Sequence, residues 1–475
     1  MTPCPTLVIA GTHSGAGKTS FTLALARALA RRGRKTQTFK VGPDFLDPTY
    51  LTLASGRPCY NLDGWMAGHD HCRRLFALTT TDADCALVEG VMGLFDGVDA
   101  QSDEGSTAEI ARLLNAPVVL IVNVHGMGRS LAALVKGYTT FRTDLRFTGV
   151  VANHCGSERH AGLLSDSLRA AGLPPLLGAI PRGAFPELAS RHLGLVTADR
   201  EQLPDSLFDA LADALEQNLS LEKIFPEKVA KTEEKTTPSE IFAKPTVAAA
   251  AIEEQKVTGA RGHLRIGVAR DAAFHFYYQD LFDALQASGC EVVFFSPLDD
   301  RHLPEGLSGL YLGGGYPELH TERLAENREM LAAIRAYADS GRPLYAECGG
   351  LMYLSRGIEM DGRFYPLAGL LPARTRMLPA RKALGYVEVA LTENSLWGRR
   401  GELLRGHEFH YSELIDDPVS DPAWRKVYSF RRRGKDAVET EGYQKGAILA
   451  SYLHLHCASR PAAVARFLER CGGTP

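Results

Sequence analysis

The chain contains 475 residues with a net charge of −3, and 45% of its residues are apolar. Because a single hydrophobic core does not grow to that size, two or three domains are expected. The small net charge gives no sign of a surface for nucleic acid or anionic lipid, and no apolar run is long enough to span a bilayer. The nine cysteines form no C-x-x-C pair, which argues against a disulfide framework and a zinc knuckle. We expect a cytoplasmic globular protein with no nucleic-acid and no membrane partner.

The first half of the chain alternates short apolar runs with longer helical patterns. The strand-like runs are 7–10, 36–41, 85–89, 118–124, 147–153 and 176–180. Several are apolar on both faces, as strands covered by helices on both sides must be. Helical segments between them imply parallel crossovers. The pattern predicts an α/β domain with a doubly wound, mostly parallel sheet.

Residues 223–262 differ in composition from the rest of the chain. Lys, Glu, Thr, Pro and Ala dominate, and too little apolar surface is present to offset the cost of ordering the segment. We interpret 223–262 as a flexible linker between an N-terminal domain, 1–222, and a C-terminal domain, 263–475. The alternative is a short helix, over AAAAIEE, that docks on one of the domains.

The alternation of strands and helices restarts after this segment. Residues 264–269, 291–295, 307–312 and 343–347 have strand-like patterns, with helical patterns around 279–288 and 321–340. Beyond residue 380, strand-like segments replace the helical ones. This pattern predicts a second α/β domain with its own core.

A glycine-rich segment, GTHSGAGKTS, connects the first strand-like run to a helical pattern. Glycines let such a loop wrap its N–H groups around phosphate oxygens, while Lys18 adds charge and Thr19 offers a hydroxyl to Mg²⁺. The strict spacing G-x-x-x-x-G-K-[ST] is not met, because Thr12 stands where the first glycine belongs and Gly11 lies one residue earlier. A purely structural turn is the alternative, but the strand before it and the helix after it favour an ATP site.

Acidic side chains follow the next strands, at the edge where open α/β sheets bind ligands. Asp44 and Asp47 come after the second strand, and Glu89 ends the third. Mg²⁺ takes oxygen ligands, usually one or two carboxylates beside phosphates, so Glu89 with Asp44 or Asp47 would suffice. A helix cap or a solvated loop is the alternative for each aspartate. The predicted metal ligands are Thr19, Asp44, Asp47 and Glu89.

The remaining candidates in this half are polar side chains at or beyond strand ends. Asn153 ends a strand-like run, where it could contact an adenine edge or form a turn. Asp96, in the loop after Glu89, is a candidate for substrate contact. The predicted nucleotide-binding residues are Gly15, Gly17, Lys18, Thr19, Ser20, Lys40 and Asn153.

These motifs carry a resemblance. GTHSGAGKT, FKVGPDFLDPTY and LVEGVMGLFDG resemble the dethiobiotin synthetase-like P-loop ligases, and most closely the cobyrinic acid a,c-diamide synthase family. The resemblance implies that ATP phosphorylates a substrate carboxylate and that an amine displaces the phosphate. The alternative from another class is a switch ATPase with a degenerate glutaminase domain. Such ATPases carry a lysine early in the loop, where this chain has His13, so the ligase is favoured.

In the second half, Cys348 stands between a strand-like run and a helical one, in LYAECGGLMYL. A thiol at such a turn is exposed, and the following helix N-terminus favours its thiolate. The N–H groups of Gly349 and of Gly314, in the turn 313–315, are candidates for an oxyanion hole. The segment SYLHLH supplies His454 as a base, with His456 two residues later. A buried structural cysteine is the alternative.

The second half resembles a class I glutamine amidotransferase domain of the cobyric-acid type, through VARDAAFHFYY, GGYPE, RGHEFHYS and SYLHLH. The resemblance implies L-glutamine as the ammonia donor and His454 as the general base. Many class I relatives carry His-x-Glu, whereas here the third position is His456, which would then orient the base. His407 and Glu408 are candidates for a surface facing the substrate, with a structural hairpin as an equal alternative.

Together the two resemblances imply one reaction. Ammonia released from glutamine would amidate the a and c acetate carboxylates of cobyrinic acid, through acyl phosphates formed from ATP with Mg²⁺. Hydrogenobyrinic acid and nickel sirohydrochlorin are alternative substrates for the same chemistry. A homo-oligomer is left open.

The composition of 223–262 generates a first prediction. Limited proteolysis should cut the chain within this segment and leave two compact fragments, because exposed polar segments are the preferred sites of nicking. Mass spectrometry of the fragments gives the cut positions. Protection of 223–262, with cuts elsewhere, would contradict the proposed domain boundaries.

Overall fold

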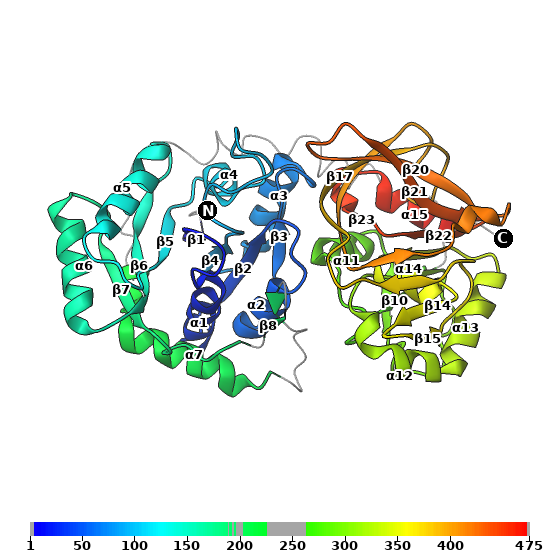
Figure 1. Cartoon of the computed structure of the whole chain (residues 1–475), viewed down its shortest axis with the longest axis horizontal. Helices are drawn as coiled ribbons and strands as arrows, with labels where there is room; N and C mark the ends of the chain where they lie inside the picture. Colours follow the sequence, from blue (N-terminus) through cyan, green and yellow to red (C-terminus); the bar gives the residue numbers. More distant parts are fainter. Residues whose placement is uncertain (1–3, 189, 192–193, 196–202, 226–262, 473–475) are drawn as a thin grey trace. The chain divides into compact units, whose positions relative to one another are not determined.

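The computed structural model describes residues 4–188, 190–191, 194–195, 203–225 and 263–472. The chain forms two compact units, 1–245 and 246–475 (Figure 1). The predicted linker and its alternative helix lie outside the described residues, except at 223–225, where helix α8 (Leu221–Ile224) crosses the expected boundary. Among the described helices, none combines the length and the apolar character that a membrane crossing requires.

The first unit is built on a seven-stranded sheet in the order β3-β2-β4-β1-β5-β6-β7, with every neighbouring pair parallel. Its strands are β1 (Thr6–Gly11), β2 (Thr36–Val41), β3 (Tyr60–Leu62), β4 (Cys85–Glu89), β5 (Val118–Asn123), β6 (Phe147–Cys155) and β7 (Leu176–Pro181). A separate pair joins β8 (Ser190–Arg191) to β9 (Gly194–Leu195). The chain reverses direction across the sheet at β1, so the end of β1 is a topological switch point, where such sheets bind ligands.

Helices cover both faces of this sheet because its strands are apolar on both sides. On β1, Ile9 packs in the core with α1 and α7, whereas Val8 packs in the core on the other face with α3 and α4. Figure 1 shows α1 and α7 side by side, and Arg27 of α1 donates hydrogen bonds of 2.7 and 3.2 Å to Asp209 of α7. The helices are α1 (Lys18–Arg31), α2 (Asp47–Ser55), α3 (His69–Thr79), α4 (Thr107–Leu113), α5 (Ser130–Phe141), α6 (Glu158–Ala170) and α7 (Asp205–Asn218). The predicted doubly wound parallel sheet is confirmed.

The second unit contains a ten-stranded mixed sheet in the order β11-β10-β12-β13-β22-β21-β20-β17-β18-β23. The segment from β11 to β22 is parallel and the rest is antiparallel. These strands are β10 (Arg265–Ala269), β11 (Glu291–Phe295), β12 (Gly309–Leu312), β13 (Leu344–Glu347), β17 (Ala383–Leu391), β18 (Leu403–His410), β20 (Arg425–Arg432), β21 (Val438–Lys445), β22 (Ile448–Ser451) and β23 (His454–Leu455). The second unit therefore has an α/β fold, as predicted.

Shorter elements complete this unit. A four-stranded sheet joins β15 (Arg363–Pro366), β14 (Gly357–Met360), β16 (Thr375–Met377) and β19 (Ser412–Leu414). The helices are α11 (Gln279–Ala287), α12 (Thr321–Glu326), α13 (Arg328–Asp339), α14 (Gly349–Leu354) and α15 (Ala463–Cys471), with 3₁₀ turns at Pro317–His320, Pro418–Ser420 and Cys457–Ser459.

The structure contains elements that the sequence-based expectation lacked. Helix α15 was not predicted, nor were the short strands β3, β8, β9, β14, β15 and β16. The helix expected over 321–340 is two helices, because Asn327 lies outside both and its side chain accepts a hydrogen bond from the Met330 N–H, which caps α13.

Candidate active sites

The glycine-rich loop of the first unit leads from β1 into α1, which begins at Lys18. Gly15 and Gly17 have φ values of 81° and 103°, in the left-handed region that favours glycine. Lys18 is buried, and its Nζ donates to the carbonyl oxygens of His13 at 3.2 Å and Met92 at 2.5 Å. Burial and the charge of Lys40 lower the pKa of Lys18 to about 8. An anionic phosphate in the loop would favour the charged form of this lysine.

Asn153, at the end of β6, contacts the same loop. Its Nδ2 donates to the carbonyl of Ala16 at 3.0 Å, and its Oδ1 accepts from the N–H of His154 at 3.0 Å. A Cβ atom at Gly17 would lie 2.2 Å from Nδ2, so only glycine allows this approach. Because both ends of the amide bind the protein, the geometry favours a role in bracing the loop over the expected adenine contact.

Four predicted residues meet beside the loop. Lys40, on β2, donates from Nζ to Asp47 Oδ2 at 2.5 Å and to Glu89 Oε1 at 2.8 Å. Thr19 donates from Oγ1 to the same Glu89 oxygen at 2.6 Å and lies 3.5 Å from Asp47 Oδ2. The strand register sets this arrangement, since Lys40 and Glu89 are direct partners in the β2–β4 pair. The structure thus gathers Thr19, Lys40, Asp47 and Glu89 in one cluster, in which Lys40 and Glu89 are buried and the other two are half-buried.

The charges of this cluster fit a divalent cation. Glu89 is fully buried, and its Oε2 has no hydrogen-bond partner among the described residues. Burial raises the pKa of Glu89 to about 7, against the opposing effect of Lys40. Burial disfavours the charged form of Lys40. The surrounding carboxylates outweigh this effect and raise the pKa of Lys40 well above its usual value. A hard cation bound to Glu89 Oε2 would satisfy the orphan oxygen and offset the excess of carboxylates.

The two aspartates after β2 make different contacts. Asp44 accepts hydrogen bonds at Oδ1 from the N–H groups of Leu46, at 2.8 Å, and Asp47, at 3.1 Å, so it holds the turn that starts α2. Asp47 turns its carboxylate toward Lys40 and Thr19, at 2.5 and 3.5 Å, whereas Asp44 Oδ2 lies 3.9 Å from Lys40 Nζ. The geometry therefore favours Asp47 as the metal ligand and gives Asp44 the capping role that the sequence left open.

Asp96 and Ser20, predicted nearby, are not part of the cluster as described. Asp96 is exposed, and its Oδ2 accepts from the N–H of Gly93 at 2.8 Å. Its charge is among those that raise the pKa of Lys18. Ser20 is half-buried in the first turn of α1.

In the second unit, Cys348 occupies a strained turn between β13 and α14. Its φ and ψ are 50° and −101°, values that a residue with a side chain rarely adopts. The backbone N–H of Cys348 donates to Ser451 at 2.7 Å, which ties the turn to the end of β22. Its thiol lies 3.7 Å from the carbonyl oxygen of Phe409. This strand–turn–helix geometry places the nucleophile at the carboxyl end of β13, where Cys348 is 4% exposed and therefore buried, not exposed as expected.

His454 pairs with Cys348 across the sheet edge. Its Nδ1 donates to Glu347 Oε1 at 2.8 Å, and the influence of the neighbouring Cys348 favours its charged form. Burial lowers the pKa of His454, but the charges of Cys348 and Glu347 and their hydrogen bonds outweigh it and raise the pKa to about 10. The predicted nucleophile and base are therefore neighbours in a buried site, and Glu347, which the sequence did not single out, is bonded to the base.

The glycine turn 313–315 packs against this pair. A Cβ atom at Gly314 would lie 2.6 Å from Cε1 of His454. The N–H of Gly313 donates to the hydroxyl of Tyr277 at 2.8 Å and is already used. Gly349 is the first residue of α14, so its N–H points from a helix N-terminus. Gly314 and Gly349 remain the predicted oxyanion donors.

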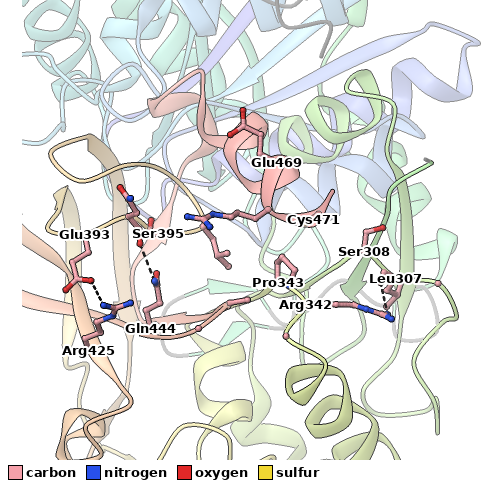
Figure 2. Close-up of a pocket in the computed structure, with 17 residues that line it drawn as sticks. Leu307, Ser308, Arg342, Pro343, Glu393, Ser395, Arg425, Gln444, Glu469 and Cys471 are labelled. Atoms are coloured by element: carbon pink, nitrogen blue, oxygen red, sulfur yellow. Dashed lines mark hydrogen bonds and ion pairs between the residues drawn. The ribbon is translucent and has the colours of Figure 1, made fainter. Parts of the chain in front are cut away.

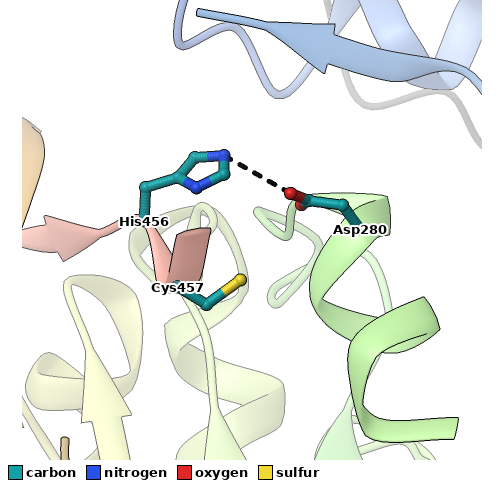
Figure 3. A group of neighbouring side chains, drawn as sticks. All are labelled: Asp280, His456 and Cys457. Atoms are coloured by element: carbon teal, nitrogen blue, oxygen red, sulfur yellow. Dashed lines mark ion pairs between the residues drawn. The ribbon is translucent and has the colours of Figure 1, made fainter. Parts of the chain in front are cut away.

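His456 does not contact His454 in the way expected of a residue that orients the base. Nδ1 of His454 is bound by Glu347, whereas Nδ1 of His456 accepts the N–H of Ala458 at 3.2 Å. Its Nε2 lies 3.8 Å from Asp280, and Figure 3 shows the ring directed at that carboxylate, beside Cys457. With Nδ1 accepting, the neutral ring carries its proton on Nε2, which suits a contact with Asp280 rather than a metal bond. The expectation that His456 orients the base is wrong.

His407 and Glu408 are buried in the antiparallel pair of β17 and β18. The His407 ring stacks on that of His454, with centroids 4.9 Å apart, and its Nδ1 lies 3.2 Å from the Tyr278 hydroxyl. Glu408 forms an ion pair with Arg432. Of the two interpretations of this segment, the structure favours the hairpin over an open surface that faces the substrate.

Comparison with known proteins agrees with both halves of the chain. Residues 7–196 match the CobQ/CobB/MinD/ParA nucleotide binding domain, and residues 265–462 match the CobB/CobQ-like glutamine amidotransferase domain. The cobyrinate a,c-diamide synthase of Syntrophotalea carbinolica is 54% identical over 99% of both chains. That of Leptospira interrogans is 41% identical over 98% of both. The chain belongs to the cobyrinate a,c-diamide synthase family. It is a glutamine amidotransferase ligase that carries an ATP-using P-loop domain, as the motifs predicted.

The family also contains enzymes named for a related substrate. The hydrogenobyrinate a,c-diamide synthase of Pseudomonas aeruginosa is 44% identical over 98% of this chain and 97% of that one. Both names thus occur among relatives that match this synthase over nearly its full length.

The large cavity in the second unit is separate from the glutaminase site. It measures about 890 Å³ and is lined at the amino ends of β12, β13 and β22 by residues such as Ser308, Arg342 and Ala447 (Figure 2). Cys348 lies at the opposite, carboxyl end of β13. The cavity therefore belongs to the other edge of the same sheet.

The contacts of the two aspartates generate a second prediction. Asp47→Asn should raise the Mg²⁺ concentration needed for half-maximal ADP formation at least about tenfold, because it removes a charged ligand from the cluster. Asp44→Ala should leave that concentration unchanged and cost about 1–2 kcal/mol of stability, because two capped N–H groups lose their acceptor. Mg²⁺ titrations and thermal unfolding of both variants measure this. A raised Mg²⁺ requirement in Asp44→Ala, with none in Asp47→Asn, would instead make Asp44 the metal ligand.

Proposed function

We propose that this synthase amidates the a and c acetate side chains of cobyrinic acid, with ammonia from L-glutamine and energy from ATP. The observation that carries the proposal is that one chain holds Cys348 at a strand–helix turn beside a His454 bonded to Glu347, as well as a P-loop beside a cluster of carboxylates. The first suits amide hydrolysis and the second suits nucleotide chemistry. The names of the full-length relatives support the substrate.

In the glutaminase half, the thiolate of Cys348 attacks the carboxamide carbon of glutamine. Oxyanion donors at Gly349 and Gly314 stabilise the tetrahedral intermediate. The C–N bond then breaks as His454 gives its proton to the leaving nitrogen, which releases ammonia and leaves a glutamyl thioester. Neutral His454 next takes a proton from water, the hydroxide displaces the thiolate, and glutamate and the imidazolium form of His454 result.

In the synthetase half, a carboxylate oxygen of the corrin acid attacks the γ-phosphorus of ATP, giving an acyl phosphate and ADP. Ammonia then attacks the acyl carbon and phosphate leaves. Lys18 and the loop amides hold the phosphates, and Thr19, Asp47 and Glu89 would hold Mg²⁺, which neutralises phosphate charge when bound. Two amidations consume two ATP and two glutamines per corrin.

Hydrogenobyrinic acid is the second candidate substrate. The relative from Pseudomonas aeruginosa, which carries that name, is more similar in sequence than the Leptospira enzyme named for cobyrinate, at 44% against 41% identity. Competition assays with cobyrinic acid, its metal-free analogue and nickel sirohydrochlorin distinguish the three substrates. Preference for nickel sirohydrochlorin would contradict the proposal.

The separation of the two chemistries generates a third prediction. Cys348→Ser should lose glutamine-dependent diamide formation roughly a thousandfold or more, because an alcohol is a poor nucleophile here. It should keep diamide formation from high ammonium salt at alkaline pH, since carboxylate activation uses other residues. The measurement is product formed with each nitrogen source at saturating ATP.

Lys18→Ala is the matched control, because it should abolish product from both nitrogen sources. Glutamine-dependent activity in Cys348→Ser at the wild-type level would end the amidotransferase assignment of this half. Ammonia-dependent product from Lys18→Ala at that level would remove Lys18 from the synthetase chemistry.

A further inference from the structure

Glu347 is the last residue of β13 and directly precedes the nucleophile. Its side chain is only 4% exposed. Oε1 accepts the hydrogen bond from Nδ1 of His454 at 2.8 Å, and Oε2 accepts one from the hydroxyl of Tyr345, also at 2.8 Å. With both oxygens bound, the carboxylate cannot rotate without losing a buried hydrogen bond.

We propose that Glu347 is the positioning residue of the glutaminase site, the group that orients His454 and stabilises its protonated form. This inference rests on the proposed glutaminase function and adds to it. In this chain the orienting carboxylate comes from the residue before the nucleophile, on the same strand, rather than from the residue two places after the base. One strand end thus supplies both partners of His454.

The strand itself holds Glu347 in place. Side chains two apart on a strand share a face, so Tyr345 and Glu347 lie side by side. Tyr345 is fully buried, with ring centroids 5.1 Å from Tyr311 and 5.0 Å from Trp397. This aromatic packing fixes the Tyr345 hydroxyl and, through it, the carboxylate.

Other buried acids near the base are committed to different partners. Glu441 accepts from the Ser451 hydroxyl at 2.7 Å and from the N–H of Tyr452. Glu408 pairs with Arg432, and Asp280 faces His456. Among these carboxylates of the described chain, Glu347 is the one bonded to His454.

The charge of Glu347 has a consequence that can be measured. The titratable groups that face His454 are Cys348 and Glu347 from the strand end and the neutral rings of His407 and His410 from β18. Only the first two favour the imidazolium. The imidazolium form of His454 is present below its pKa and lost above it. Removing the carboxylate of Glu347 lowers that pKa, so glutamine hydrolysis should fall off at a lower alkaline pH.

The test compares glutamine hydrolysis by the full-length wild type, Glu347→Gln and Glu347→Asp across pH. Glu347→Gln should lower the rate near neutral pH roughly a hundredfold. It should also shift the alkaline limb of the pH–rate profile, where the rate falls as pH rises, toward neutral pH by at least about one unit. Glu347→Asp keeps the charge but draws it back by one methylene, so it should retain the wild-type limb at a reduced rate. Ammonia-dependent diamide formation should be unchanged in both.

Two control variants separate positioning from packing. Tyr345→Phe removes the bond to Oε2 but leaves the one to His454, so it should reduce the rate only a few-fold and leave the limb in place. Glu441→Gln changes a neighbouring buried carboxylate and should also leave the limb where it is. A shifted limb in these controls but not in Glu347→Gln would overturn the proposal.

The outcomes for the inference and for the proposed function are distinct. If Glu347→Gln keeps the wild-type rate and limb while Cys348→Ser is inactive with glutamine, Glu347 has no positioning role and the glutaminase stands. If Cys348→Ser itself stays active, the function fails first. If Glu347→Gln does not fold, Glu347→Asp decides, because a wild-type rate in that variant would show that the carboxylate position does not matter.

Discussion

A carboxylate at the buried carboxyl end of a parallel strand needs a partner of opposite charge, and both candidate sites are built around such a pair. Glu89 ends β4 and is bonded to Lys40, while Glu347 ends β13 and is bonded to His454. An unpaired charge at either position would carry a large desolvation penalty, and removing one partner of a buried pair typically costs about 3–5 kcal/mol. In each unit, therefore, the chemistry and the stability of the sheet edge depend on the same contact.

Strand register brings these partners together. Lys40 faces Glu89 because β2 and β4 are paired in parallel, and Glu347 faces the segment after β22 because Glu347 and Ser451 are partners in the β13–β22 pair. A slip of one residue in either pair would turn the charged side chain to the opposite face. The apolar faces of the same strands oppose such a slip, since it would also expose their core residues. The hydrophobic core thus specifies the position of each charge.

This dependence explains what the sequence could and could not predict. The P-loop, the carboxylates at strand ends and the turn at Cys348 follow from local patterns, in which apolar runs, glycines and a nucleophile are neighbours in the chain. The partner of His454 depends on tertiary structure, because Glu347 and His454 are 107 residues apart and meet only once β13 pairs with β22. The sequence offered His456 because it is two residues away, but its ring is used as a cap at Ala458.

Asn153 and strand β3 were missed or misinterpreted for related reasons. An asparagine at a strand end has no local signal that separates a turn, a ligand contact and a brace, and only its tertiary hydrogen bond to the carbonyl of Ala16 favours the brace. Strand β3 has three residues, too few for a period to be recognised, and it forms only because β2 lies beside it. In contrast, the parallel strands β1, β2, β4, β5 and β6 were placed correctly, since burial on both faces leaves runs that only a central strand explains.

The two sites also differ in how far toward alkaline pH they keep their charges. His454 is held as an imidazolium up to a pKa of about 10, whereas burial and Lys40 lower the pKa of Lys18 to about 8. With both groups active in the protonated form, the nucleotide-free synthetase site loses its charge first as the pH rises. Bound phosphates counter this, because a nearby anion raises the pKa of a lysine. Saturating ATP should therefore help the synthetase half to keep the charge of Lys18 at alkaline pH.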